Sequence, residues 1–122
     1  MSSLLAQADQ LLTGAAGARS HSLRAACWLA RAALEDTVRA LLEAKQLDPG
    51  TASMSVALSC LHAAYQGSEP LIPLHADVAW SGLSRASHHH AYELSPTISE
   101  VRHLLQLVAG LAAHPSGSGT PD

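Results

Sequence analysis

The chain has 122 residues, enough for one domain with its own hydrophobic core, and 48% of them are hydrophobic. Only 3% are aromatic and Phe is absent, so Leu, Ala and Val must build that core, which favours closely packed helices over a sheet. Seven Lys and Arg against ten Asp and Glu give a formal net charge of −3, which excludes a general nucleic-acid binder and leaves room only for local RNA contact.

The sequence shows neither the pattern of a membrane-spanning helix nor that of a secretory signal peptide. The apolar stretches are interrupted well before the roughly 20 residues that a membrane-spanning helix needs. The first residues also lack a basic region followed by a long apolar one. We therefore expect a cytoplasmic protein without membrane contact. Cys27 and Cys60 fall on apolar helical stripes and are expected to be reduced core residues.

The first predicted helix is short. Ser2 or Ser3 can cap it, and it ends at Gly14. Its apolar residues are Leu4, Leu5, Ala8, Leu11 and Leu12. We expect a peripheral element that packs across one end of the other helices and is followed by a loose segment over residues 14–17.

A long second helix is predicted from about Ser20 to Leu47 and is stopped by Asp48-Pro49-Gly50. Its apolar residues recur at helical spacing and form one stripe, made of Leu23, Cys27, Ala30, Leu34, Val38 and Leu41. Arg31, Glu35 and Arg39 follow one another at i, i+4 spacing and are expected on a solvated face.

Three further helices follow. One begins at Thr51 or Ser53 and is closed by Gly67, and the next has Pro73 in its first turn and reaches Leu94. Thr97 and Glu100 then have the spacing of a capping box for the last helix, which ends before Pro115. Its buried residues are predicted to be Ile98, Val101, Leu104, Leu105, Val108 and Leu111.

The fold class is therefore all-α, a four- to five-helix up-and-down bundle in a single domain over residues 1–114. Residues 115–122 are too polar and too rich in glycine to offset the entropy of ordering, so a disordered C-terminal tail is expected.

The chemistry-bearing residues gather on the fourth predicted helix, where Arg85 is followed by His88, His89 and His90. An always-charged guanidinium close to imidazoles that titrate near neutral pH suits phosphate binding combined with proton transfer. His90 shares a stripe with Trp80, Leu83 and Leu94, which predicts partial burial.

Arg85 and His90 do not point together within one chain, because five residues rotate a helix by about 140 degrees. A second copy related by a two-fold axis would bring each arginine opposite the histidine of its partner. We therefore expect a homodimer that buries part of the fourth helix, with Trp28 and Trp80 on or beside the apolar stripes.

Arg85, four intervening residues and His90 on a late helix of a small all-helical domain resemble the Arg-x4-6-His motif of HEPN domains. The resemblance covers the helical layout from about Ser20 to Leu111. It implies a dimer whose two motifs form a composite cleft, and in many members of the family that cleft cleaves RNA without a metal. Many active members have Asn, Asp or His directly after the arginine, where this chain has Ala86.

The resemblance implies an RNA-cleaving or RNA-binding element of a toxin or defence system, with a partner such as a nucleotidyltransferase-type antitoxin. Arg85 and His90 would be the catalytic pair, and the products would be a 2′,3′-cyclic phosphate and a free 5′-hydroxyl. His88, His89 and Tyr92 would be secondary phosphate or RNA contacts.

One other interpretation stays open, and a second is disfavoured. A non-enzymatic module for homodimerisation or partner binding needs the same apolar helix faces but no catalytic cleft, and its histidines would be core or interface residues. A metal site is disfavoured, because three consecutive histidines on a helix point in directions about 100 degrees apart. We therefore expect no metal and no cofactor, and whether the chain is an enzyme is left open.

Overall fold

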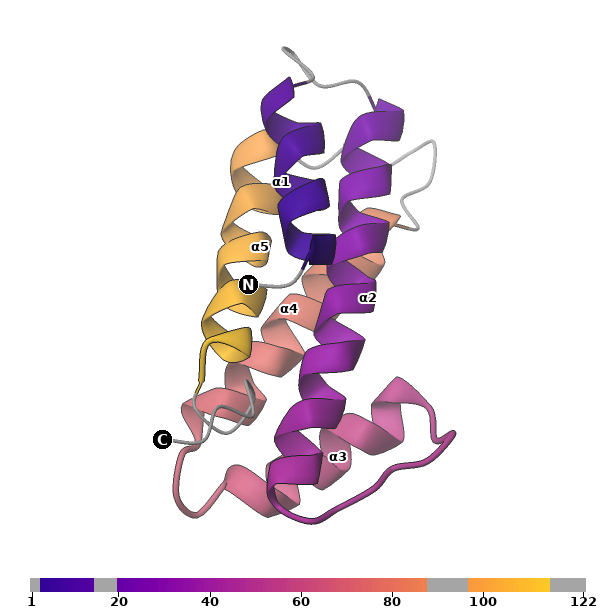
Figure 1. The fold of residues 1–122 in the computed structure, drawn as a ribbon. Helices are drawn as coiled ribbons and strands as arrows, with labels where there is room; N and C mark the ends of the chain where they lie inside the picture. The colour runs from indigo at the N-terminus through magenta and orange to yellow at the C-terminus, as the bar shows by residue number, and fades with distance from the viewer. Residues whose placement is uncertain (1–2, 15–19, 88–96, 115–122) are drawn as a thin grey trace.

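The structure, a computed structural model, describes residues 3–14, 20–87 and 97–114, and within these ranges it contains five helices and no strand. The helices are α1 (Ser3–Gly14), α2 (Ser20–Ala44), α3 (Met54–Tyr65), α4 (Leu71–Ser87) and α5 (Ile98–Ala112) (Figure 1). The predicted all-α bundle is confirmed. The predicted extension of the fourth helix to Leu94 and the predicted tail over residues 115–122 lie outside the described residues.

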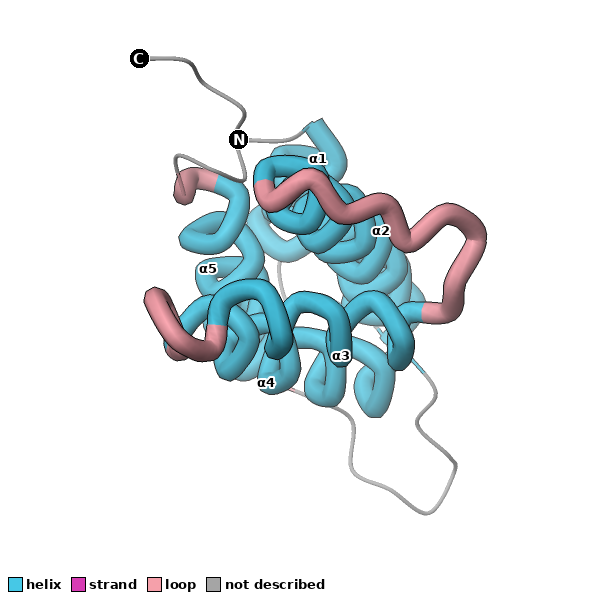
Figure 2. The backbone as a smooth tube through the Cα atoms, turned by 90° about the horizontal axis from the view of Figure 1, so that it is seen from below, coloured by secondary structure: helices cyan, strands magenta, loops and turns pink. Residues whose placement is uncertain are grey.

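Four helices, α1, α2, α4 and α5, run alternately up and down, and α3 lies across the end where α2 finishes and α4 begins (Figures 1 and 2). The helix α1 packs against α2 and α5, whereas α3 packs against α2 and α4. The helix across the end is thus α3, not the first helix as the sequence suggested.

The predicted position of α1, across one end of the bundle, was wrong because the apolar side chains of α1 pack into the central core. Leu5, Ala8 and Leu12 are at most 3% exposed and belong to the central core. Three side chains at 3, 4 spacing are enough to seat a 12-residue helix along a groove between two longer ones. The helix α1 therefore completes the bundle.

The core is built as its composition predicts, mainly from Leu, Ala and Val. All six residues of the predicted α2 stripe, from Leu23 to Leu41, are buried. Burial raises the pKa of the Cys27 thiol to about 11, so this thiol stays protonated and inert at neutral pH. Cys60 is only partly buried at the edge of the core. Both cysteines are free, as predicted.

The helix ends follow local chemistry. Ser53 caps α3 by accepting from Val56 N, and Thr97 and Glu100 form the predicted capping box at α5. The helix α2 stops at Ala44, three residues before the predicted Leu47. Gln46 there adopts a left-handed conformation with φ of 61°.

Tyr65 fixes the crossing of α3 over the end of the bundle. Its ring is buried, and its hydroxyl donates to the carbonyl of Leu41 at 2.7 Å. The Lys45 ammonium lies 4.8 Å from the ring centroid, and the ring of His114 meets Tyr65 edge-on. His114 is also paired with Glu69, so this corner joins the ends of α2, α3 and α5.

The helices α4 and α5 approach closely at Gly82. A Cβ at this position would lie 2.7 Å from Cδ2 of Leu104, which is inside van der Waals contact. Glycine here lets the two helices meet without displacing Leu104. None of the helices in the described ranges is both long and apolar enough to cross a bilayer.

Candidate functional site

Arg85 lies in the last turn of α4, and its side chain is exposed. It stands on a row of exposed residues at 3, 4, 3, 4 spacing, which a helix places on one face. We call this the outer row of α4; it consists of Leu71, Leu74, Val78, Ser81 and Arg85. The predicted arginine is therefore available to a ligand or to a second copy of the chain.

The outer row is apolar along most of its length. Leu71 is 60% exposed, Leu74 50% and Val78 45%. Large aliphatic side chains at consecutive helical positions are rarely left in water over several turns of a helix, so the row is a candidate contact surface. Its apolar part leads along the helix directly to the guanidinium of Arg85.

The remaining predicted site residues follow Arg85 in the sequence. His88, His89, His90 and Tyr92 lie outside the described residues, which stop at Ser87 and resume at Thr97. The structure therefore places Arg85 at the point where α4 leads into the histidine run.

A second polar feature, which sequence reasoning missed, is a guanidinium between two indoles. Arg31 of α2 lies with its Cζ 5.4 Å from the centroid of Trp28 and 4.6 Å from the centroid of Trp80. Trp28 stands one turn before Arg31 on α2, whereas Trp80 comes from α4. Arg31 was predicted on a solvated face, but its side chain is half-buried in this stack.

The Trp28 indole itself is 52% exposed, so one side of the stack is open to solvent. Cation–π contacts of this geometry stabilise by about 0.5 to 2 kcal/mol each. Through Arg31, these contacts connect the exposed indole of Trp28 on α2 to Trp80 on α4. In the next turn of α4 after Trp80, the hydroxyl of Ser84 is buried and has no hydrogen-bond partner within the described part of the chain.

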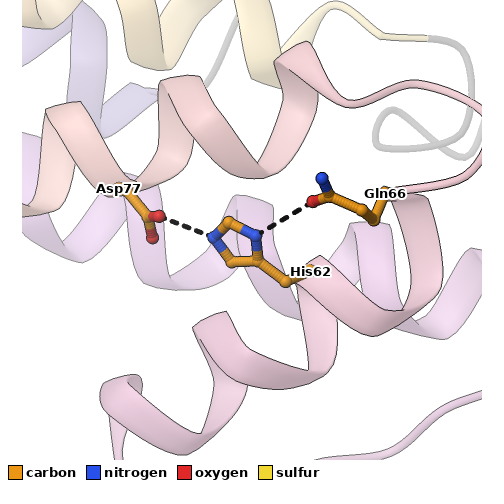
Figure 3. Close-up of polar contacts among 3 residues, drawn as sticks. All are labelled: His62, Gln66 and Asp77. Atoms are coloured by element: carbon orange, nitrogen blue, oxygen red, sulfur yellow. Dashed lines mark hydrogen bonds and ion pairs between the residues drawn. The ribbon is translucent and has the colours of Figure 1, made fainter.

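A third feature joins α3 to α4. Nε2 of His62 lies 2.6 Å from Oδ2 of Asp77, and its Nδ1 lies 3.3 Å from Oε1 of Gln66 (Figure 3). Both oxygens accept hydrogen bonds, so this arrangement suits a doubly protonated imidazolium. The hydrogen bond to Asp77, followed by that to Gln66, raises the pKa of His62 above its ordinary value.

The His62–Asp77 pair does not form a catalytic dyad. Both ring nitrogens are occupied by side chains of the protein, which leaves neither free to accept a proton from a substrate. Within the described ranges, no group of three His, Cys, Asp or Glu side chains lies close enough together to hold a metal ion. His62 instead acts as a polar clasp between two helices, with both partners partly exposed.

Comparison with known proteins yields no relative. No family model, no curated protein and no solved structure matches this chain.

The features that the sequence missed share one cause. Trp28 and Arg31 stand three residues apart and were visible as a pair on one helix face. Their contact with Trp80 depends on which helix packs beside α2. The same holds for His62 and Asp77, which come from different helices and meet only because α3 turns back onto α4.

Proposed function

We propose that this protein is a HEPN-like homodimer that acts on RNA in the cytoplasm, with Arg85 and His90 of two protomers forming a composite site that cleaves without a metal. The observation that carries the proposal is the exposed Arg85 at the end of the apolar outer row of α4. A dimer that covers this row would bring Arg85 to the interface. An all-helical bundle of this size also agrees with the family resemblance.

The proposed geometry requires a two-fold axis close to the last turn of α4. Each Arg85 would then face the segment that follows α4 in the partner, and that segment begins with the histidine run. In such a composite site, Arg85 and His90 of the same chain do not have to point toward each other.

The proposed chemistry is an internal displacement at phosphorus. The 2′-hydroxyl oxygen forms a bond to the phosphorus while the bond to the 5′-oxygen breaks, leaving a 2′,3′-cyclic phosphate and a 5′-hydroxyl. One His90 accepts the proton of the 2′-hydroxyl, and the other His90 donates a proton to the leaving oxygen. Arg85 binds the phosphate and stabilises the negative charge that develops on it.

The test is cleavage of single-stranded RNA in the presence of a chelator, with the end groups identified. The wild-type dimer should leave cyclic phosphate ends. Replacing His90 with Ala should abolish cleavage, because general acid–base catalysis contributes a factor of about 100 to 10,000. Arg85→Ala should lower the rate comparably, because it removes a phosphate contact that strengthens in the transition state.

Arg39→Ala is the matched control, because Arg39 is exposed on α2 and lies outside the proposed site. It should leave cleavage unchanged, and the thermal midpoint should stay constant across all three variants. A wild-type protein that dimerises but cleaves no RNA would favour the second candidate, a non-enzymatic dimerisation module. That candidate rests on the same apolar outer row.

A further inference from the structure

We propose that Trp28, held by Arg31 against Trp80, is a stacking platform for a base of single-stranded RNA. The inference rests on the proposed function, since it assigns a substrate contact outside the Arg85–His90 pair. It starts from the stack of Trp28, Arg31 and Trp80 and from the charge of the surface around it.

The exposed indole of Trp28 has the two properties that a base platform needs. It is 52% exposed, so a flat ring can lie against it. It is also held in place, since the Arg31 guanidinium lies 5.4 Å from its centroid and is itself anchored over Trp80 at 4.6 Å. Stacking of a base on such a ring is worth about 1 to 3 kcal/mol and tolerates every base.

The charge around the stack favours RNA over a protein partner. Residues 20–34 of α2 contain Arg24 and Arg31 but no acid, and residues 78–87 of α4 contain Arg85 but no acid. Arg24 near the start of α2, Arg31 near its middle and Arg85 in the last turn of α4 thus make up three of the seven Lys and Arg residues of the chain. These two stretches carry three arginines and no acid, although the chain has a net charge of −3.

The acid-free stretches end at the nearest acids along these two helices, and α5 adds Glu100 in its first turn at the end where α4 finishes (Figure 1). Glu35 stands one turn after Arg31 on α2, and Asp77 stands three residues before Trp80 on α4, where it is bound to His62. Arg24, Trp28 and Arg31 follow at 4, 3 spacing and share one face of α2. A strand that stacks a base on Trp28 thus has the exposed Arg24 within one helical turn to bind a neighbouring phosphate.

Binding is measured separately from cleavage. A short oligouridylate with a fluorescent label is titrated with the dimer in which His90 is replaced by Ala, so that the RNA stays intact, and the anisotropy of the label is followed. Trp28→Ala, added to this background, should weaken binding about five- to hundredfold, as the loss of one stacked base predicts. Trp28→Phe retains a flat ring and should restore most of the affinity.

Salt dependence tests the phosphate contact. The logarithm of the binding constant should fall linearly with the logarithm of the salt concentration, and Arg24→Gln should reduce the slope by about 0.7, the value for one phosphate of a single strand. Arg39→Gln, from the acid-bearing half of α2, should leave the slope unchanged.

The outcomes separate this inference from the proposed function. If cleavage requires His90 but the affinity for RNA is unchanged by Trp28→Ala, the platform is wrong and the proposed ribonuclease activity is retained. Binding that depends on Trp28 without any cleavage supports the platform and overturns the ribonuclease. If Trp28→Ala changes only the oligomeric state, the indole is a protein contact and the platform is wrong. Absence of RNA binding by the wild-type dimer overturns both.

Discussion

At the scale of single residues, the described polar contacts are mostly structural, and His62 shows why. The hydrogen bonds to Asp77 and Gln66 stabilise its charged form more than partial burial disfavours it, so the pKa of His62 is raised. A group whose pKa is higher in the folded than in the unfolded chain binds protons more tightly when folded. Its contribution to stability is therefore fully present below pH about 6.5 and is lost as the pH rises through the folded value.

The first prediction at this scale concerns pH. The thermal midpoint of the wild type should exceed that of His62→Ala most clearly near pH 6, and the difference should shrink toward pH 8. The reason is that neutral His62 cannot donate to both Asp77 and Gln66 at once. Thermal unfolding followed by circular dichroism at several pH values measures the difference.

Asp77→Asn provides the control for that clasp. It removes the carboxylate that raises the pKa of His62, so the imidazole should titrate at a lower pH in this variant, as followed by NMR. An unchanged titration in Asp77→Asn would mean that the clasp contributes nothing in solution. Because the side chains of His62 and Asp77 are both more than 40% exposed, high salt should also weaken the effect.

At the scale of helices, α2 ends at Ala44, before the end at Leu47 that the sequence predicted, and its C-terminal hydrogen bonds explain the difference. The N–H of Gln46 bonds to the carbonyl of Glu43 and that of Leu47 to the carbonyl of Leu42, the two hydrogen bonds of a Schellman motif. The motif places Gln46 at the position that usually holds glycine, with φ of 61°. The predicted stop signal at Asp48-Pro49-Gly50 therefore comes after the helix has already closed.

Gln46→Gly is predicted to stabilise the protein by up to about 1 kcal/mol, since glycine adopts a left-handed conformation without the steric cost of a Cβ. Denaturant unfolding measures the change. Glu43→Gly is the matched control, because Glu43 is an exposed residue within α2, where glycine should instead cost about 1 kcal/mol. A loss of stability in both variants would contradict the conformation of Gln46.

Helix positions and their stripes were predictable because they depend on local spacing. The α2 stripe and the Thr97–Glu100 box are both present as expected. What local spacing cannot give is the partner of each face. The prediction from sequence therefore put α1, in place of α3, across the end of the bundle, and it did not include the contact between Trp80 and Arg31. Of the candidate site, Arg85 is placed as an exposed residue, whereas His90 lies outside the described residues.

At the scale of the whole molecule, the bundle leaves the outer row of α4 uncovered by the described helices. The helix α4 uses its other faces for α2, α3 and α5, which leaves Leu71, Leu74 and Val78 in solvent. A stable dimer interface buries about 1,200 to 2,000 Å² in total. Three side chains cover only a fraction of that area, so residues beside the row must also join the interface.

We expect the protein to be a dimer at micromolar concentration, and Leu74→Glu or Val78→Glu should shift it to a monomer, because each places a charge in a desolvated apolar contact. Light scattering measures the mass. Val56→Glu is the matched control: Val56 is 50% exposed, like Leu74, but stands on α3, so this variant should remain dimeric. The monomeric variants should also lose RNA cleavage while keeping their helical content by circular dichroism, because Arg85 of one protomer needs His90 of the other. A wild-type monomer would remove the composite site, and a dimer that survives both α4 variants would move the interface to another face.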